Sequence, residues 1–348
     1  MKKKNTKKYV LPTLACFLFI AGIVYYYFFS SISTKDDTTY IYIDNDDSVD
    51  SVYNKIEPNA TARGLSALHL LVKNSNYAEH IRSGRYALTT TIGAFSLFRH
   101  LKNGMQTPVN VTIPSCRTID DLCKAISSKL MVKESDLYDS LTSPAVCRHY
   151  GYDTATIACM FIPNTYDLYW NSSISKILSR MQTESRKFWN FTRKEKAKRM
   201  KLSPNEVITL ASIVDEETAN NQEKPMIAGM YYNRLMLRNA EYPNGMPLQA
   251  DPTIKFAWKQ FGIKRIYNHL LDIKSPYNTY KNIGLPPGPI RIPSVVGIDA
   301  VLNYVHHNYL YMCAKEDFSG THNFAHTYEE HLNNATKYSK ALNERGIK

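Results

Sequence analysis

The sequence lacks the residue patterns that mark metal sites and nucleic-acid binding. Its 348 residues include six cysteines, no CxxC pair and no HExxH motif. They show neither zinc-finger spacing nor an RNA-binding signature. Five lysines before residue 9 carry five of the +12 net charges, so the remainder is only mildly basic. We therefore expect no metal, no cofactor and no nucleic-acid partner, and mild basicity suits an anionic polymer or a membrane surface.

A long hydrophobic run occurs once, near the N-terminus. Residues 9–29 read YVLPTLACFLFIAGIVYYYFF and carry no charge. At about 1.5 Å per residue, a helix of this length spans roughly 30 Å of hydrocarbon. The preceding lysines favour a cytoplasmic N-terminus. A cleaved signal peptide is the alternative, but no small-x-small cleavage site follows.

We therefore expect a single-pass protein of the inner (cytoplasmic) membrane. Its parts would be a cytoplasmic tail (1–8), a transmembrane anchor (9–29) and a polar linker (30–37). Residues 31–348 would lie outside the cytoplasm, where disulfides can form. Five cysteines fall in that part, and an odd number leaves at least one thiol free or paired between chains. Buried free thiols, with at most one local bridge, are the simpler interpretation.

The first part of the external region has the pattern of a small α+β module. Strand patterns and helix patterns alternate without a repeat, in the order strand 38–43, helices 46–56 and 62–74, strand entry 83–89, helix 90–104, strand 109–113 and helix 117–131. Such strand–helix–helix–strand units resemble the LysM type of glycan-binding module. We expect this LysM-like subdomain to cover 38–150.

The remaining residues, 151–348, predict a second, mixed α+β domain. A single long helix is expected over 174–200, and its basic end is interpreted as a solvated helix face. A loop-rich stretch covers 239–293, a strand 309–314 and a final helix 329–346. The fold class is therefore α+β behind a single N-terminal transmembrane helix.

One helix of this domain ends in three consecutive acids, within ITLASIVDEETAN (208–220). It begins with a capping box, because Ser203 fits the N-cap and Glu206 follows three residues later. At 100° per residue Glu217 falls on the apolar face, whereas Asp215 and Glu216 point elsewhere. The three acids are therefore not equivalent.

The predicted position of Glu217 favours a protonated carboxyl near neutral pH. Burial of a carboxylate raises its pKa, and neighbouring acids act in the same direction. The partial negative charge at a helix C-terminus adds to the effect. A protonated carboxyl is what a general acid requires. The alternative is a structural glutamate paired with a buried arginine such as Arg234.

A series of motifs resembles one enzyme family. The motifs are FIPNTYDLYW (161–170), ASIVDEET (211–218), IAGMYYNRL (227–235), MPLQADPTI (246–254), YNTY (277–280), GLPPGPI (284–290) and GTHNF (320–324). In this order they resemble the membrane-anchored endolytic murein transglycosylases, the YceG-like or MltG family, over roughly residues 155–335. Two departures are Asn164 for the family's aspartate, and Asp215–Glu216 where the family commonly has Glu-Lys. The family's catalytic acid corresponds to Glu217.

The resemblance implies a lyase of the peptidoglycan. Such an enzyme cleaves the β-1,4 bond between N-acetylmuramic acid and N-acetylglucosamine within a glycan strand and leaves a 1,6-anhydro end on the sugar. One carboxylate suffices, since the sugar's own C6 hydroxyl attacks. The implied partners are glycan strands, the membrane and penicillin-binding glycan synthases. The expected substrate-binding residues are Gln249, Asp251, Tyr277, Asn278, Thr279, Tyr280 and His322.

Three alternatives remain open from the residues. Asp251 could act as a second catalytic carboxylate, which would imply lysozyme-like hydrolysis. A non-catalytic, glycan-binding anchor protein would use the LysM-like part. A zinc site at His322, His326 and His331 would need ligand spacings that differ from known helical motifs.

Overall fold

The computed structural model describes residues 7–263 and 265–346, and they form a mixed α+β protein of helices and two-stranded sheets, as predicted. The chain divides into two compact units. The first comprises residues up to 110 together with 129–131 and 167–172, and the second comprises the rest. This division differs from the predicted boundary at residue 150. The reason is that the segment at 115–116 is hydrogen-bonded to Ile292, deep in the second unit.

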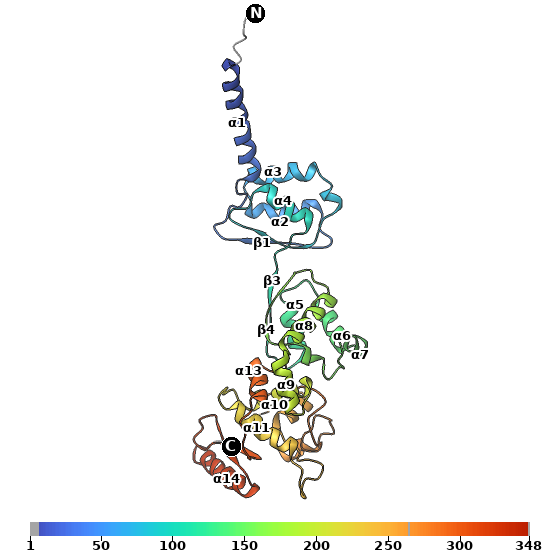
Figure 1. Cartoon of the computed structure of the whole chain (residues 1–348), viewed down its shortest axis with the longest axis vertical. Coiled ribbons are helices and arrows are strands. Elements are labelled where there is room, and N and C mark those ends of the chain that lie inside the picture. The colour runs from blue at the N-terminus through green and yellow to red at the C-terminus, as the bar shows by residue number, and fades with distance from the viewer. Residues whose placement is uncertain (1–6, 264, 347–348) are drawn as a thin grey trace, which may run out of the picture. The chain divides into compact units, whose positions relative to one another are not determined.

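The first unit contains the predicted strand–helix–helix–strand order (Figure 1). Its elements are α1 (Lys7–Phe29), β1 (Thr39–Ile43), α2 (Val49–Ile56), α3 (Ala62–Lys73), β2 (Gly84–Leu88) and α4 (Ala94–Asn103). Strands β1 and β2 pair antiparallel, with Ile41 opposite Tyr86. Alternate strand residues are buried, and Ser48 and Thr61 cap the two intervening helices. Side-chain caps and alternating burial therefore build this core.

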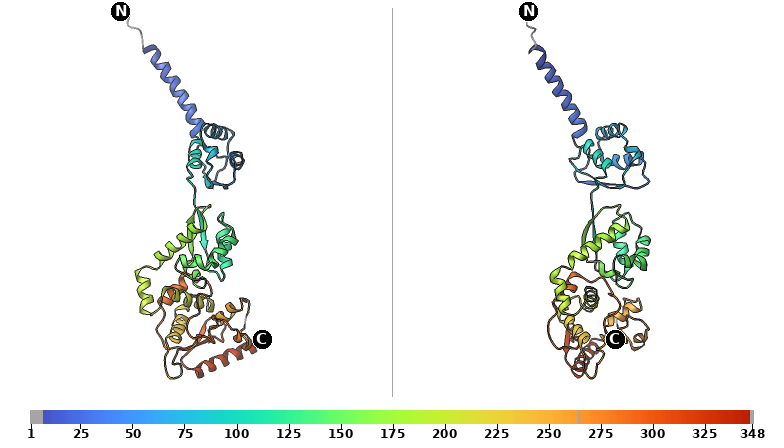
Figure 2. Two further views of the ribbon diagram at one scale, coloured as in Figure 1. Left: turned by 90° about the vertical axis from the view of Figure 1, so that its right-hand side faces the viewer. Right: turned by 45° about the vertical axis from the view of Figure 1, so that its right-hand side comes forward.

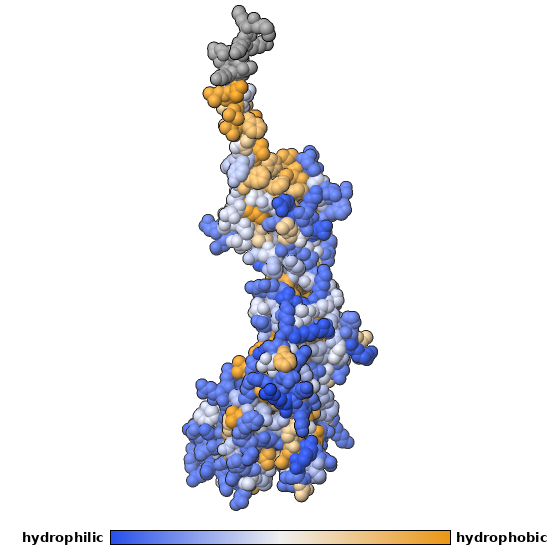
Figure 3. All heavy atoms as spheres, viewed as in Figure 1, coloured by the Kyte–Doolittle hydropathy of each residue, from blue (hydrophilic) through white to orange (hydrophobic). Residues whose placement is uncertain are grey.

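Helix α1 matches the predicted hydrophobic run. Its Val10–Phe29 stretch is long and apolar enough to cross a membrane and lies outside the hydrophobic core. Figure 3 shows these side chains as an exposed hydrophobic surface. Near an N-terminus, a signal sequence has the same length and composition. Insertion of α1 in a membrane therefore stays a prediction.

The second unit is mainly helical. Its elements are α5 (Ile119–Ser127), α6 (Glu134–Thr142), α7 (Pro144–His149), α8 (Ile174–Phe188), α9 (Phe191–Arg199), α10 (Pro204–Glu217), α11 (Lys224–Met236), α12 (Asp251–Ala257), α13 (Val295–Leu302), β5 (Tyr311–Ala314), β6 (His322–Ala325) and α14 (Tyr328–Glu344). Strands β3 (Val109–Ile113) and β4 (Asn164–Leu168) extend across the division between the units. Helix α10 is central, and every residue from Val207 to Val214 is buried. Helices α11, α12 and α13 pack against it.

The long helix predicted over 174–200 is wrong, because the chain forms two helices there. Helix α8 ends at Phe188, and α9 starts after Asn190, whose side chain accepts a hydrogen bond from the backbone of Arg193. An asparagine cap of this kind competes with helix continuation. Most of the basic run is exposed, as expected for a solvated face, whereas Arg193 forms an ion pair with Asp299 at 3.1 Å.

The C-terminal part is a hairpin covered by a helix. Strands β5 and β6 pair antiparallel, and α14 packs along them (Figure 2). A capping box of Thr327 and Glu330 starts α14. The GLPPGPI loop packs closely against the backbone at Ala155, since a Cβ on Gly288 would lie 2.0 Å from the carbonyl oxygen of Ala155. All six cysteines are free thiols.

Candidate active site

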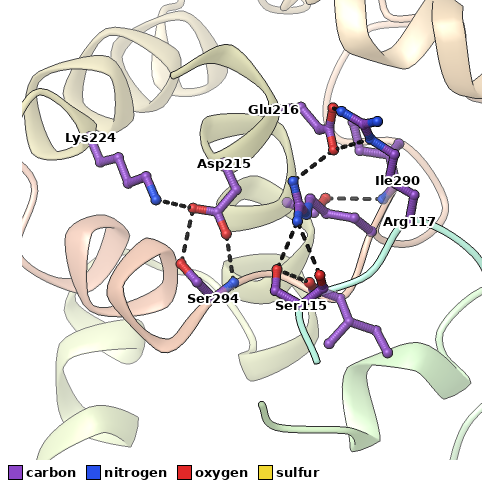
Figure 4. A network of polar contacts seen from close by, with 10 residues as sticks. Ser115, Arg117, Asp215, Glu216, Lys224, Ile290 and Ser294 are labelled. Carbon is purple, nitrogen blue, oxygen red and sulfur yellow. Dashed lines mark hydrogen bonds and ion pairs between the residues drawn. The ribbon is translucent and has the colours of Figure 1, made fainter. Parts of the chain in front are cut away.

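The three acids at the end of α10 differ in their partners rather than in burial. Asp215 forms an ion pair with Lys224 at 2.8 Å, and both side chains are under 10% exposed. Glu216 receives two hydrogen bonds from Arg117, at 2.8 and 2.9 Å, and one from Arg291 at 2.8 Å (Figure 4). Within the part of the chain that the structure describes, Glu217 has no such cation.

The spacing of 100° per residue predicted that Glu217 points in a different direction from Asp215 and Glu216, and the different partners of the three acids agree with this. The premise that α10 has a single apolar face was wrong. Helix α10 is packed on all sides, so Asp215 and Glu216 are also withdrawn from water. A buried charge must be paired, because desolvation is costly. The two paired acids thus fix the last turn of α10 to the surrounding structure. Glu217 is the acid of the three that no described ion pair engages.

Glu217 lies on a cavity of about 420 Å³ in the second unit. The cavity is lined by Glu217, Met230, Tyr231, Arg234, Leu248, Gln249, Asp251, Tyr280, Tyr311, Met312, Cys313, Ala314, His322, Tyr328 and His331. Four of the seven residues expected from the sequence to bind substrate lie here together with Glu217: Gln249, Asp251, Tyr280 and His322. The volume falls within the usual range for a ligand site.

Burial raises the pKa of Glu217 to about 7. The hydroxyl of Tyr231 donates a hydrogen bond to its carboxyl and acts in the opposite direction, because it stabilises the ionised form. The charge of Asp251 raises the pKa and that of Lys255 lowers it. A carboxyl with a pKa near neutrality can both give and take a proton at physiological pH.

Asp251 stands at the start of α12 and is exposed. Its Oδ1 accepts a hydrogen bond from the hydroxyl of Tyr280. Burial and the neighbouring Asp251 raise the pKa of Tyr280, so its phenol keeps its proton as donor. The cavity therefore holds two carboxyl groups in unlike surroundings, one buried and one solvated.

Arg234 is buried and holds Gln249 on the cavity wall. Its guanidinium donates to the side-chain oxygen of Gln249 at 3.1 Å and to the carbonyl oxygen of Leu248 at 2.8 Å. The backbone of Gln249 has a φ of 50°, which residues other than glycine adopt at an energetic cost. Arg234 is thus engaged with the wall of the cavity, and its hydrogen-bond partners in the described part of the chain do not include Glu217.

The other expected substrate residues lie off this cavity. Asn278 and Thr279 are 0% and 1% exposed. Asn278 donates to the carbonyl oxygens of Leu271 and Ile273, and Thr279 accepts from the backbone of Ala250. Their hydrogen bonds hold the loop that carries Tyr280.

Tyr277 also lies elsewhere, and His322 has a protein partner. Tyr277 packs on Phe256 at 4.7 Å between ring centroids and faces a different cavity. His322 lines the first cavity with its Nδ1 3.1 Å from Glu223. Among the described residues, no group of three or more His, Cys, Asp or Glu side chains is arranged to hold a metal ion.

Some cavity residues escaped the sequence reasoning. Tyr231 and Arg234 are three residues apart on α11, so helical spacing places them on one side of the helix. Tyr311 and His331 come from β5 and α14, and their rings stack at 5.5 Å. No local pattern joins a late strand and the final helix to α10, so these residues required the tertiary structure.

Comparisons with known proteins agree on one family. The YceG-like family model matches residues 41–337. The endolytic murein transglycosylase of Bacillus subtilis (strain 168) is 34% identical over 175 residues, covering 50% of this chain and 46% of the relative. The protein of that name from Streptococcus pneumoniae (strain ATCC BAA-255 / R6) is 27% identical over 303 residues, covering 76% of this chain and 52% of the relative. The chain thus spans about half the length of these curated relatives.

A solved structure shares the fold. The crystal structure of a YceG-like protein from Listeria monocytogenes gives a TM-score of 0.54 at 24% identity. The match covers 86% of this chain and 99% of that one.

Proposed function

This chain belongs to the YceG-like family, and on that premise we propose that it is an endolytic lytic transglycosylase of peptidoglycan, as the names of its relatives suggest. The observation that carries the proposal is the state of Glu217. Of three adjacent acids, it is the one without a cationic partner among the described residues. It lies on the cavity of about 420 Å³, and burial raises its pKa to about 7. Such a carboxyl suits a residue that acts first as acid and then as base.

The proposed reaction needs only this carboxyl. Glu217 gives its proton to the glycosidic oxygen between N-acetylmuramic acid and N-acetylglucosamine, and the bond to C1 breaks. The acetamido group of the substrate stabilises C1. The ionised Glu217 then takes the proton of the C6 hydroxyl, whose oxygen bonds to C1 and forms the 1,6-anhydro end. Attack within one sugar benefits from proximity, and the Tyr231 hydroxyl stabilises Glu217 while it is charged.

The cavity walls support binding of a sugar chain. Gln249, Asp251, Tyr280 and His322 would contact hydroxyl and acetamido groups. Tyr311 and Tyr328 add aromatic faces, which stack on sugar rings. Asn278 and Thr279 would act indirectly, by holding the loop of Tyr280.

A lysozyme-like hydrolase is the second candidate. Asp251 shares the cavity with Glu217, and a pair of carboxyl groups is what most glycosidases use. Asp251 is exposed, and its Oδ1 accepts a hydrogen bond from the hydroxyl of Tyr280, which positions it for the role of base or nucleophile.

The proposed setting is the outer face of the inner membrane. Helix α1 would anchor the chain with its N-terminus in the cytoplasm, and the catalytic unit would face the cell wall. There the enzyme would act beside glycan synthases and end the elongation of nascent strands.

The test compares products of the full chain and of Glu217→Gln on isolated peptidoglycan, by mass spectrometry. A transglycosylase gives fragments about 18 Da lighter than hydrolysis products, since no water is added. These fragments should be absent with Glu217→Gln. Full-mass reducing ends would favour the hydrolase with Asp251, and equal activity of both proteins would remove Glu217 from the reaction.

A further inference from the structure

The second unit contains another cavity, which the proposed reaction does not use. Its volume is about 250 Å³, and it receives residues from α5, α6, α12 and the loop at 289–292. Tyr277 belongs to it, although the sequence placed Tyr277 with the sugar-binding residues. The proposed reaction therefore assigns no ligand to this second cavity.

Aromatic rings form one wall of this second cavity. Phe256 lies 4.7 Å from Tyr277 and 6.4 Å from Phe261, measured between ring centroids. The guanidinium of Arg117 stands 5.6 Å from the centroid of Phe261. These rings offer apolar surface to a ligand, and the cation lies directly beside it.

Cationic side chains line the same cavity beside these rings. Arg117 and Arg291 share the single carboxylate of Glu216. A guanidinium has five N–H donors, and the buried Nε of Arg291 has no hydrogen-bond partner within the described ranges. Lys259 adds an exposed ammonium, and Asp120 is the acid that also lines the cavity. Positive charge therefore exceeds negative charge, which favours an anionic ligand.

The two cavities lie on either side of the same short elements. Helix α12 gives Asp251 to the catalytic cavity and Phe256 to the second one. Five residues of helix correspond to about 7.5 Å along the axis. The loop at 277–280 likewise gives Tyr280 to the first cavity and Tyr277 to the second. One ligand with two chemically different parts can therefore reach both.

We propose that the second cavity binds the carboxylate-bearing peptide that murein carries on its muramic acid residues. The inference rests on the proposed function, because the glycan must lie at Glu217 for its peptide to reach this site. Three extended residues span roughly 10 Å, which exceeds the length of α12 between Asp251 and Phe256. Carboxylates would meet Arg291 and Lys259, and the aliphatic parts would lie on the rings. Recognition of the peptide would then select glycan that has kept its stems.

The experiment measures binding by the full-length Glu217→Gln chain in detergent, using calorimetry. Two probes are compared: a tetrasaccharide of alternating N-acetylglucosamine and N-acetylmuramic acid, with and without the tripeptide L-Ala–γ-D-Glu–L-Lys on its muramic acids. We expect the peptide-bearing probe to bind roughly tenfold more tightly, as a few charge-assisted contacts would give. Lys259→Glu should abolish most of this ratio.

Two further variants control for the result. Lys198→Glu makes the same charge change on the exposed face of α9 and should keep the ratio. Thr154→Phe fills the second cavity from its exposed rim and should abolish it. Equal affinity for both probes, or a ratio that survives both Lys259→Glu and Thr154→Phe, overturns the peptide site while leaving the glycan site intact. Failure to bind either probe would instead contradict the proposed function.

Discussion

Replacing Tyr231 with phenylalanine removes the hydrogen bond that its hydroxyl donates to Glu217. This bond favours the ionised carboxylate and holds its pKa down against the effect of burial. A hydrogen bond to a charged group contributes about 1.5 kcal/mol or more. Because one pKa unit corresponds to about 1.4 kcal/mol, the pKa should rise by about one unit in the variant.

The assay is the pH dependence of kcat/KM for release of soluble fragments from peptidoglycan. Since the first step needs protonated Glu217, activity should fall as the pH rises through its pKa. That alkaline limb lies near pH 7 in the parent and should move about one unit higher in Tyr231→Phe. The position of the limb is the readout, because a lost hydroxyl also changes the height of the profile.

Tyr232→Phe is the matched control. It removes the same atom from the next residue, whose hydroxyl donates to the carbonyl oxygen of Met200 at 3.1 Å and not to Glu217. Its alkaline limb should stay where it is in the parent. A limb that does not move in Tyr231→Phe, or moves to lower pH, would refute the assignment of this hydrogen bond to the working carboxylate.

Three other substitutions test the energetics of the fold. Burial raises the pKa of Glu217 in the folded chain above its value in the unfolded chain, so the free energy of unfolding falls as the pH rises between these two pKa values. Calorimetry should therefore find Glu217→Gln more stable than the parent at pH 8, by up to about 3 kcal/mol. At pH 4 the two proteins should be equally stable. Lys224→Met leaves Asp215 buried without its cation and should cost about 3–5 kcal/mol in urea unfolding, with Asp215→Leu in the same chain restoring much of the loss. Gly288→Ala should lower the melting temperature because its Cβ meets a backbone carbonyl at 2.0 Å, whereas Gly262→Ala, with open space around it, should not.

The sequence predicted local structure correctly where residues close together in the chain determine it. The capping box of Ser203 and Glu206 starts α10 as predicted, and the alternation of β1 and β2 gives their buried faces. The break at Asn190 was missed, because the same residues also fit a continuous helical period. The cap at Asn190 became evident only once its side chain was seen to accept a hydrogen bond from Arg193.

The candidate site was only partly predictable, and His322 and Asn278 show why. The motifs selected both as substrate residues, yet the structure puts His322 on the catalytic cavity and Asn278 in the interior of a loop. Sequence order cannot separate a side chain that faces a ligand from one that supports its neighbour. That difference depends on which backbone carbonyls lie within reach.

The sequence by itself determined the apolar N-terminal helix, the start of α10 and the choice of Glu217, because helical period and capping act over a few residues. Only the tertiary structure showed why, of the three acids, Glu217 is the one that no described cation pairs with. Asp215 and Glu216 are paired with Lys224 and Arg117, and Arg117 lies 99 residues from Glu216 in the chain. Pairing of buried charges depends on distance in space, and folding alone brings those distant cations to the end of α10.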